Sequence, residues 1–200
     1  LLMLVMIGVF LGIVTSQSDR FQEIIKPILD TMQTLPAFIY LIPAFYLFGL
    51  GAPGAILATV IYALPPVVRL TNLGIRQVPT GIDEAATSFG ATRVQLLIKI
   101  KIPLAMPAIK LGVNQTVMMA LALVVLATFI GAPGLGDIVL RGMQRLNVGK
   151  ALEGGLAIVL MAIVLDRVTY AMGQSDQTNG SQHDHVFRLF PQGLEHVKPI

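Results

Sequence analysis

Long apolar stretches separated by short polar segments dominate this chain. Residues 1–18 and 31–68 carry no charged side chain, and two further apolar runs cover 111–130 and 154–165. A helix needs about 20 mainly apolar residues to cross the hydrocarbon core of a bilayer. The pattern therefore predicts an all-α, polytopic integral membrane protein.

Turn signals divide the longest uncharged run and end another. Residues 31–68 are too many for one crossing, and Gly51-Ala52-Pro53-Gly54 supplies a turn in their middle. A second Gly-Ala-Pro-Gly sequence, residues 131–134, follows the run 111–130. We therefore predict five spans, at about 1–16, 35–50, 54–73, 111–130 and 152–172.

The two ends of the chain differ in character. No basic region precedes the apolar opening at Leu1, so we predict no signal peptide and expect an incomplete first span with helices missing upstream. Residues 173–200 are polar and are predicted to form a disordered cytoplasmic tail. His183 and His185 flank an aspartate there, but in a solvated tail we expect no metal site.

The interval 74–110 is the longest amphipathic stretch. Asp83 and Glu84 suit the first turn of a helix, and Gly90 suits a left-handed helix end. A second short helix over about 92–100 is predicted, with Pro103 and Pro107 ending regular structure after it. An exposed apolar stripe on such a hairpin predicts a partner surface, and a loop lying on lipid headgroups is the alternative.

Positive charge sets the orientation. If 74–110 is cytoplasmic, the interval 16–34 and the tail lie on the same side. That side then holds all of the 14 basic residues except Arg141, Arg145 and Lys150. Lys and Arg accumulate on the cytoplasmic side of membrane proteins, so this orientation is favoured.

The spacing in 74–110 resembles the EAA signature of bacterial ABC importer permeases. Glu84-Ala85-Ala86 is followed after three residues by Gly90, and after nine more by Ile100-Lys101-Ile102-Pro103. Ile102 stands where the family pattern has Leu, and every other specified position matches. The resemblance implies the ABC transmembrane type-1 permease fold over 1–172, with 74–110 as the coupling loop.

The same resemblance implies roles and partners. Glu84, Ala85, Ala86 and Gly90 would make or shape the contact with an ATP-binding subunit, and Ile100, Ile102 and Pro103 would hold the second helix against the bundle. Implied partners are two ABC ATP-binding subunits, a second permease copy and an extracytoplasmic binding protein, in the bacterial cytoplasmic (inner) membrane. No G-x-x-x-x-G-K-[ST] loop occurs, so ATP would be used by the partner and no cofactor is expected in this chain.

Four stretches outside the signature resemble the permeases of glycine betaine and proline betaine importers in particular. These stretches are residues 27–38, 62–71, 112–116 and 134–142. The expected activity is import of such compatible solutes by alternating access. Choline, carnitine or an amino acid is the alternative cargo. An ion-coupled secondary transporter or a membrane scaffold is the alternative class, although we find no inverted repeat.

Polar side chains within spans are a second lead, because burial in a bilayer is costly for them. Candidates for the translocation path are Asn72, Asn114, Gln115, Thr116 and Tyr62, with helix–helix hydrogen bonding as the alternative. Aromatic side chains in or beside the spans could line a passage for a quaternary ammonium group, or simply pack there: Phe38, Tyr40, Phe45, Tyr46, Phe48 and Tyr62.

Composition agrees with this picture. Charged residues make up 12% of the chain, about half the share in soluble domains. The absence of Cys excludes disulfides and thiolate metal sites. The net charge of +3 comes from residues beside apolar spans without interleaved aromatics, so no nucleic-acid binding is predicted. No catalytic motif occurs, and we expect no enzyme activity.

Overall fold

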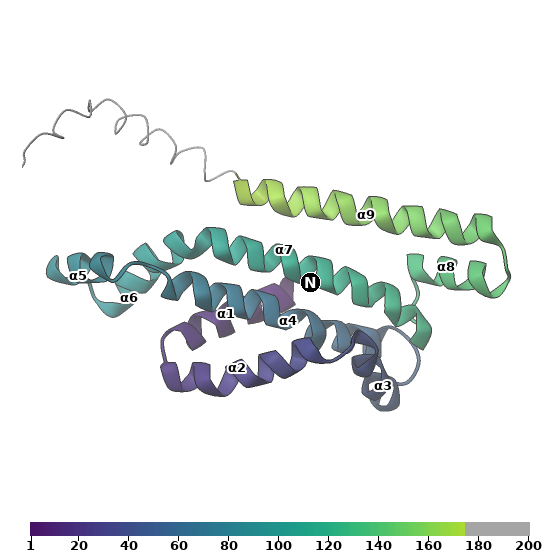
Figure 1. The fold of residues 1–200 in the computed structure, drawn as a ribbon, viewed down its shortest axis with the longest axis horizontal. Helices are drawn as coiled ribbons and strands as arrows, with labels where there is room; N and C mark the ends of the chain where they lie inside the picture. The colour runs from purple at the N-terminus through teal and green to yellow at the C-terminus, as the bar shows by residue number, and fades with distance from the viewer. Residues whose placement is uncertain (175–200) are drawn as a thin grey trace, which may run out of the picture.

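The computed structural model describes residues 1–174, with side chains to Tyr170, and the regular elements in this range are all helices (Figure 1). The α-helices are α1 Leu2–Ser16, α2 Asp19–Thr34, α3 Ala37–Phe48, α4 Ala52–Arg76, α5 Thr80–Ser88, α6 Arg93–Leu96, α7 Ile102–Leu126, α8 Leu135–Gln144 and α9 Val148–Gln174. A π-helical turn, Leu97–Lys101, joins α6 to α7, and a 3₁₀ turn, Ala127–Ile130, follows α7. The all-α class is confirmed. The predictions for the tail, including His183 and His185, fall almost wholly outside the described residues.

Three helical stretches of the described chain are long and apolar enough to cross a membrane: Ala52–Arg76, Arg93–Ile130 and Val148–Tyr170. Helices α2 and α3 qualify only as a pair bent by 96°, which raises the number to four. Helix α1, with 15 residues, is a shorter apolar helix. The five expected spans thus correspond to three long helices, one bent pair and α1.

The bend between α2 and α3 replaces the straight span expected at 35–50. Only 12 residues of that interval form α3. The break falls at Leu35, which has an extended backbone and precedes Pro36. Proline disfavours the α conformation in the residue before it, so the helix stops there. The preceding interval, one of the short polar segments between apolar runs, forms the amphipathic helix α2, whose first turn is capped by the Ser18 hydroxyl.

The expectation that Pro103 and Pro107 end regular structure is wrong. Pro103 lies in the first turn of α7, directly after the π-helical turn, and Pro107 lies inside α7. Residues Arg93 to Ile130 form one helical stretch as a result. Proline is tolerated inside membrane helices because neighbouring groups satisfy the freed backbone carbonyl.

Helices α4 and α7 form the centre of the bundle, with α1 against α4 and α9 against α7 and α8 (Figure 1). Small residues allow these close approaches. A Cβ atom at Gly12 would lie 2.5 Å from Thr71 Cβ and 2.9 Å from the Val68 carbonyl oxygen. Inside a bilayer, tight packing of this kind holds helices together because lipid tails are as apolar as the side chains.

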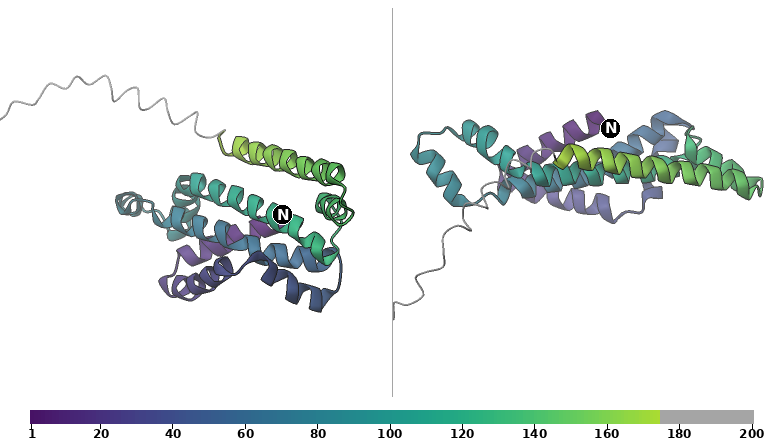
Figure 2. Two further views of the ribbon diagram at one scale, coloured as in Figure 1. Left: turned by 45° about the vertical axis from the view of Figure 1, so that its right-hand side comes forward. Right: turned by 90° about the horizontal axis from the view of Figure 1, so that it is seen from above.

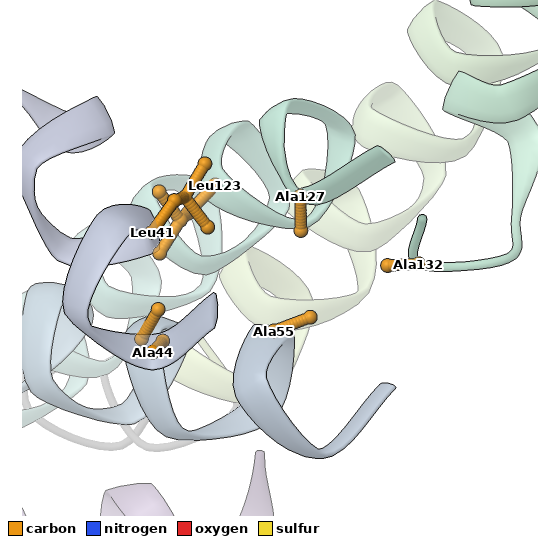
Figure 3. Close-up of a cluster of buried hydrophobic side chains, with 7 residues drawn as sticks. Leu41, Ala44, Ala55, Leu123, Ala127 and Ala132 are labelled. Atoms are coloured by element: carbon orange, nitrogen blue, oxygen red, sulfur yellow. The ribbon is translucent and has the colours of Figure 1, made fainter. Parts of the chain in front are cut away.

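The two Gly-Ala-Pro-Gly turns meet at the end of the bundle away from α5. The Gly51 N–H donates to the Ile130 carbonyl at 2.9 Å. A cluster of buried side chains joins α3, α4, the end of α7 and the chain that follows it: Leu41, Ala44, Ala55, Ala58, Leu123, Ala127 and Ala132 (Figure 3). This cluster holds the short helix α3 against the two central helices.

Substituting Gly142 by Ala should loosen the hairpin of α8 and α9. A Cβ at this position would lie 2.5 Å from the Ala151 nitrogen and 2.8 Å from its Cα, so backbone must move. Overpacking of this kind costs ~1–3 kcal/mol. We expect a lower thermal unfolding midpoint in detergent. Gly149→Ala is the control, since its Cβ would meet only the Asn147 side chain at 3.5 Å. Equal midpoints for the two variants would contradict the packing.

Candidate functional site

Helices α5 and α6 project from one end of the bundle as a hairpin (Figure 2). Gly90 turns the chain between them with φ +81°, which confirms the predicted left-handed helix end. The Ala91 N–H donates to the Ala86 carbonyl at 3.0 Å, and the Gly90 N–H donates to the Thr87 carbonyl at 2.9 Å. This pair of bonds is the Schellman arrangement, which closes a helix end with a left-handed glycine.

The second arm of the hairpin begins with a capping box. The Thr92 hydroxyl accepts from the Gln95 N–H at 3.3 Å, and the Gln95 side chain accepts from the Thr92 N–H at 2.9 Å. Only Arg93–Leu96 is regular α-helix, and the π-helical turn follows at once. The short helix expected over 92–100 is therefore the start of the long helical stretch that becomes α7.

An ion pair ties α5 to the base of α7. Asp83 Oδ2 lies 2.6 Å from Lys101 Nζ, and the two side chains are 29% and 21% exposed. The other carboxylate oxygen, Oδ1, is buried and has no partner among the described residues. Partial shielding from water strengthens such a pair relative to one at the surface. Sequence reasoning missed this contact, since the two residues are far apart along the chain and no local pattern links them.

The hairpin presents most of the predicted contact residues to solvent. Glu84, Ala85 and Gly90 are exposed, whereas Ala86 is buried. Beside them Phe89 is 93% exposed, and Val94 and Ile98 are also exposed. An apolar patch rimmed by polar groups marks a contact with a protein or with a membrane surface.

The residues expected to anchor the second arm behave differently from one another. Ile102 packs, together with Leu97, against the buried cluster of Ile75, Ala105 and Ile109. Pro103 is exposed and Ile100 is half-buried, and neither belongs to that cluster. The packing of Ile102 suits the expected anchoring role, and Leu97 contributes to the same contact.

The predicted path residues do not form one site. Asn72 is buried and lines a cavity between α1, α2 and α4. Asn114, on α7, donates from its amide to Asp166 Oδ1 of α9 at 3.2 Å. The ring of Tyr62 packs against that of Tyr40 of α3 in a tilted arrangement, with the centroids 5.7 Å apart. These three positions lie on different interfaces of α4 and α7.

The remaining two candidates face different surroundings. Thr116 is fully buried, and its hydroxyl has no partner in the described part of the chain. Gln115 is exposed. Asp166, the partner of Asn114, is a polar residue that the sequence analysis did not place among the candidates. A carboxylate inside an apolar helix was the available signal.

Comparison with known proteins gives the family. The family described as "Binding-protein-dependent transport system inner membrane component" matches residues 5–175. The glycine betaine/proline betaine transport system permease protein ProW of Escherichia coli K12 is 51% identical over 182 residues, which cover 91% of this chain and 51% of ProW. The glycine betaine/carnitine transport permease protein GbuB of Listeria monocytogenes is 49% identical over 86% of this chain and 61% of GbuB.

The fold has a solved counterpart. A chain of the MetNI methionine ABC transporter in an inward-facing conformation superposes with a TM-score of 0.71, covering 87% of this chain and 91% of that chain at 19% identity. The present chain spans about half the length of ProW. With the match over residues 5–175, the chain belongs to the family of binding-protein-dependent transport system inner membrane components.

Proposed function

We propose that this chain is the permease subunit of an ATP-driven importer for glycine betaine and proline betaine. The observation that carries the proposal is the exposed hairpin of α5 and α6. It presents Glu84, Ala85 and Gly90 of the signature beside the apolar side chain of Phe89, at one end of a helical bundle. An exposed apolar patch on a rigid hairpin suits a docking contact with a partner subunit.

Coupling would run through two mechanical links. The first is the continuous helical stretch from Arg93 to Ile130, which carries movement of the hairpin into a membrane span. The second is the Asp83–Lys101 ion pair, which braces α5 against the same stretch. Closure of two ATP-binding subunits on the hairpins would then shift the spans between outward-open and inward-open arrangements. ATP belongs to those partners, and this chain contributes no nucleotide site.

The other partners follow from the same proposal. A second permease copy supplies the other half of the translocation path, and an extracytoplasmic binding protein delivers the cargo. Asn114 and Asp166, which bond to each other across α7 and α9, would line that path as a polar pair. Ile102 and Leu97 hold the hairpin arm to the bundle through their apolar contacts.

The cargo proposal draws on the names of the relatives, which carry glycine betaine, proline betaine and carnitine. These solutes share a quaternary ammonium group and a carboxylate. Carnitine is therefore the second candidate cargo, favoured over an amino acid by the GbuB likeness.

Uptake of labelled glycine betaine at high osmolarity tests the proposal. Cells lacking other betaine systems would express the complete protein with its ATPase and binding protein. We expect uptake that excess unlabelled proline betaine blocks, and that disappears when the partner ATPase carries an inactivated ATP site. Uptake of labelled carnitine in the same cells, with none of glycine betaine, would transfer the assignment to carnitine. Uptake that persists with the inactive ATPase would contradict an ATP-driven importer.

A further inference from the structure

The corner that joins α8 to α9, residues 143–150, presents apolar side chains that the described part of the chain does not cover. It lies at the end of the bundle opposite to the hairpin of α5 and α6 (Figure 1). Every residue of the corner is exposed. Met143, Leu146 and Val148 are 62%, 89% and 79% exposed. Large apolar side chains gathered in this way on one short segment indicate a contact surface.

Leu146 has a backbone conformation that leucine rarely adopts. Among the described residues it alone combines a side chain with a positive φ, +52°. Its N–H donates to the Met143 carbonyl at 3.1 Å, and the Asn147 N–H donates to the Gly142 carbonyl at 2.8 Å. Glycine usually occupies this place in a Schellman helix end, because a side chain there costs free energy. Leu146 therefore weakens the fold through its backbone and gains nothing from burial, a combination typical of functional positions.

Hydrogen bonds and close packing hold the corner in one shape. The Asn147 side-chain oxygen accepts from the Lys150 N–H at 3.1 Å, which caps the start of α9. A Cβ atom at Gly142 would lie 2.5 Å from the Ala151 nitrogen, so α8 and α9 meet closely just behind the corner. A surface fixed in this way loses little conformational freedom when a partner binds.

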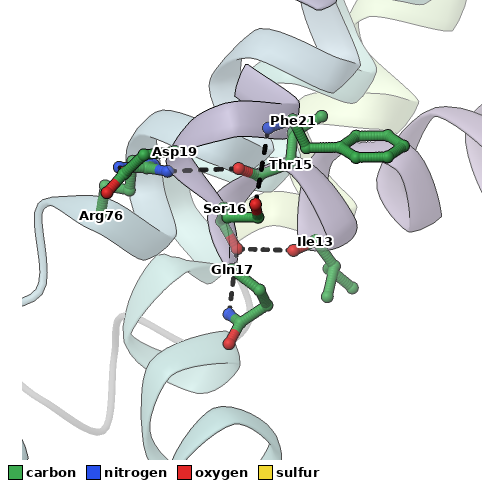
Figure 4. Close-up of polar contacts among 8 residues, drawn as sticks. Ile13, Thr15, Ser16, Gln17, Asp19, Phe21 and Arg76 are labelled. Carbon is green, nitrogen blue, oxygen red and sulfur yellow. Dashed lines mark hydrogen bonds and ion pairs between the residues drawn. The ribbon is translucent and has the colours of Figure 1, made fainter. Parts of the chain in front are cut away.

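Basic side chains flank Leu146 without a role in the fold. Arg145 and Lys150 are exposed and form no ion pair within the described part of the chain. At the opposite end of the bundle Arg76 pairs with Asp19 at 2.6 Å and donates to the Thr15 carbonyl at 3.3 Å (Figure 4). Basic residues are disfavoured on the extracytoplasmic side of membrane proteins, so the two at the corner run against this bias. They favour a partner that carries negative charge.

The corner lies beyond the apolar part of α9. Lys150 and Glu153 are exposed and precede the uncharged run that starts at Gly154. The stretch from Val148 to Gly154 is about 9 Å long at 1.5 Å per helical residue. Charged side chains are costly in the hydrocarbon core, so the corner lies outside it, where a protein can reach Leu146.

The partner follows from the proposed importer function, on which this inference rests. The matched family depends on a binding protein, and the corner lies on the side from which that protein arrives. We propose that the α8–α9 corner is a docking surface for the extracytoplasmic binding protein. Leu146 enters an apolar hollow of that protein, and Arg145 and Lys150 meet carboxylates around it. An apolar centre with charged groups at its rim is the usual arrangement of a protein interface.

Binding to the purified importer complex tests this proposal. The complex with the complete permease would be placed in lipid nanodiscs and titrated with the purified binding protein, with biolayer interferometry as the readout. Leu146→Gly and Arg145→Glu should each raise the half-saturating concentration about tenfold, as expected for residues central to an interface. Arg20→Glu is the matched control, because Arg20 is an exposed arginine on α2 at the opposite end of the bundle.

Leu146→Gly also distinguishes docking from stability. Glycine adopts the left-handed conformation without the cost that leucine bears, so the variant should unfold at no lower a temperature than the wild type. Weaker binding by a complex of undiminished stability supports a direct contact. Weaker binding that accompanies a lower unfolding temperature would overturn it, since the leucine would then be needed for the fold.

The remaining outcomes separate this surface from the importer assignment. Unchanged affinity in both corner variants, with normal binding by the wild type, would overturn the surface and leave the importer function intact. Equal weakening by Arg20→Glu would also overturn it, because the charge effect would not depend on the corner. Absence of binding by the wild type would overturn both proposals. The titration is run with glycine betaine and again with carnitine, so that a wrong cargo cannot imitate a wrong surface.

Discussion

Gly90→Val should abolish solute uptake while the variant still reaches the membrane. Gly90 has φ +81°, and a β-branched residue is a strong outlier in this left-handed region. A Cβ there would meet nothing within 4 Å, so the effect comes from backbone conformation alone. The turn between α5 and α6 would have to open, and the signature residues would lose their arrangement for the ATP-binding subunit. Osmotically stimulated uptake in cells measures the loss.

Gly81→Ala is the matched control for that experiment. Gly81 lies inside α5, and a Cβ there also meets nothing within 4 Å, but its φ is not positive. Alanine in place of a helical glycine stabilises a helix by about 1 kcal/mol. Uptake should therefore remain near the wild-type level. Equal loss in both variants would show that the surface of the hairpin matters at these positions and that the left-handed turn does not.

Local features of the site could be predicted from the sequence. The left-handed turn at Gly90 depends on residues 85–91 alone, and the structure confirms it with bonds that close the end of α5. The two Gly-Ala-Pro-Gly turns, one after α3 and one after the 3₁₀ turn that follows α7, could also be predicted. Glycine and proline act on the backbone of their immediate neighbours. Alternation of apolar and polar runs predicted the class of fold for the same reason.

Features that depend on the direction of helices could not be predicted. Asp83 and Lys101 meet only because a left-handed turn, a four-residue helix and a π-helical turn orient them together. Pro103 and Pro107 read as helix ends because proline breaks most helices in water, whereas α7 continues through Pro107. The charges of α2 resemble those of a loop, but its apolar residues recur at helical spacing, as Phe21, Ile25 and Ile28 show, and this was the available signal.

Lys101→Glu should uncouple ATP hydrolysis from transport. The substitution places two carboxylates at the 2.6 Å contact that now joins α5 to the base of α7. Loss of a partly buried hydrogen bond to a charged group costs ~1–3 kcal/mol, and the repulsion adds to it. The hairpin could still occupy the ATP-binding subunit, but its movement would no longer be braced against the span. In proteoliposomes we expect solute moved per ATP hydrolysed to fall about tenfold, with hydrolysis largely retained.

Reversal of both charges distinguishes a coupling role of the Asp83–Lys101 ion pair from a general loss of stability. The double variant Asp83→Lys, Lys101→Glu recreates an ion pair of opposite direction and should recover much of the transport per ATP. Asp137 and Arg141 form an ion pair on α8, and one of the two side chains is mainly exposed. Exchanging these two residues should leave transport per ATP unchanged, since the pair lies outside the hairpin. If the double variant transports no better than Lys101→Glu, the ion pair is not the link. If both variants lose ATP hydrolysis and transport together, the residues hold the complex assembled and do not couple it.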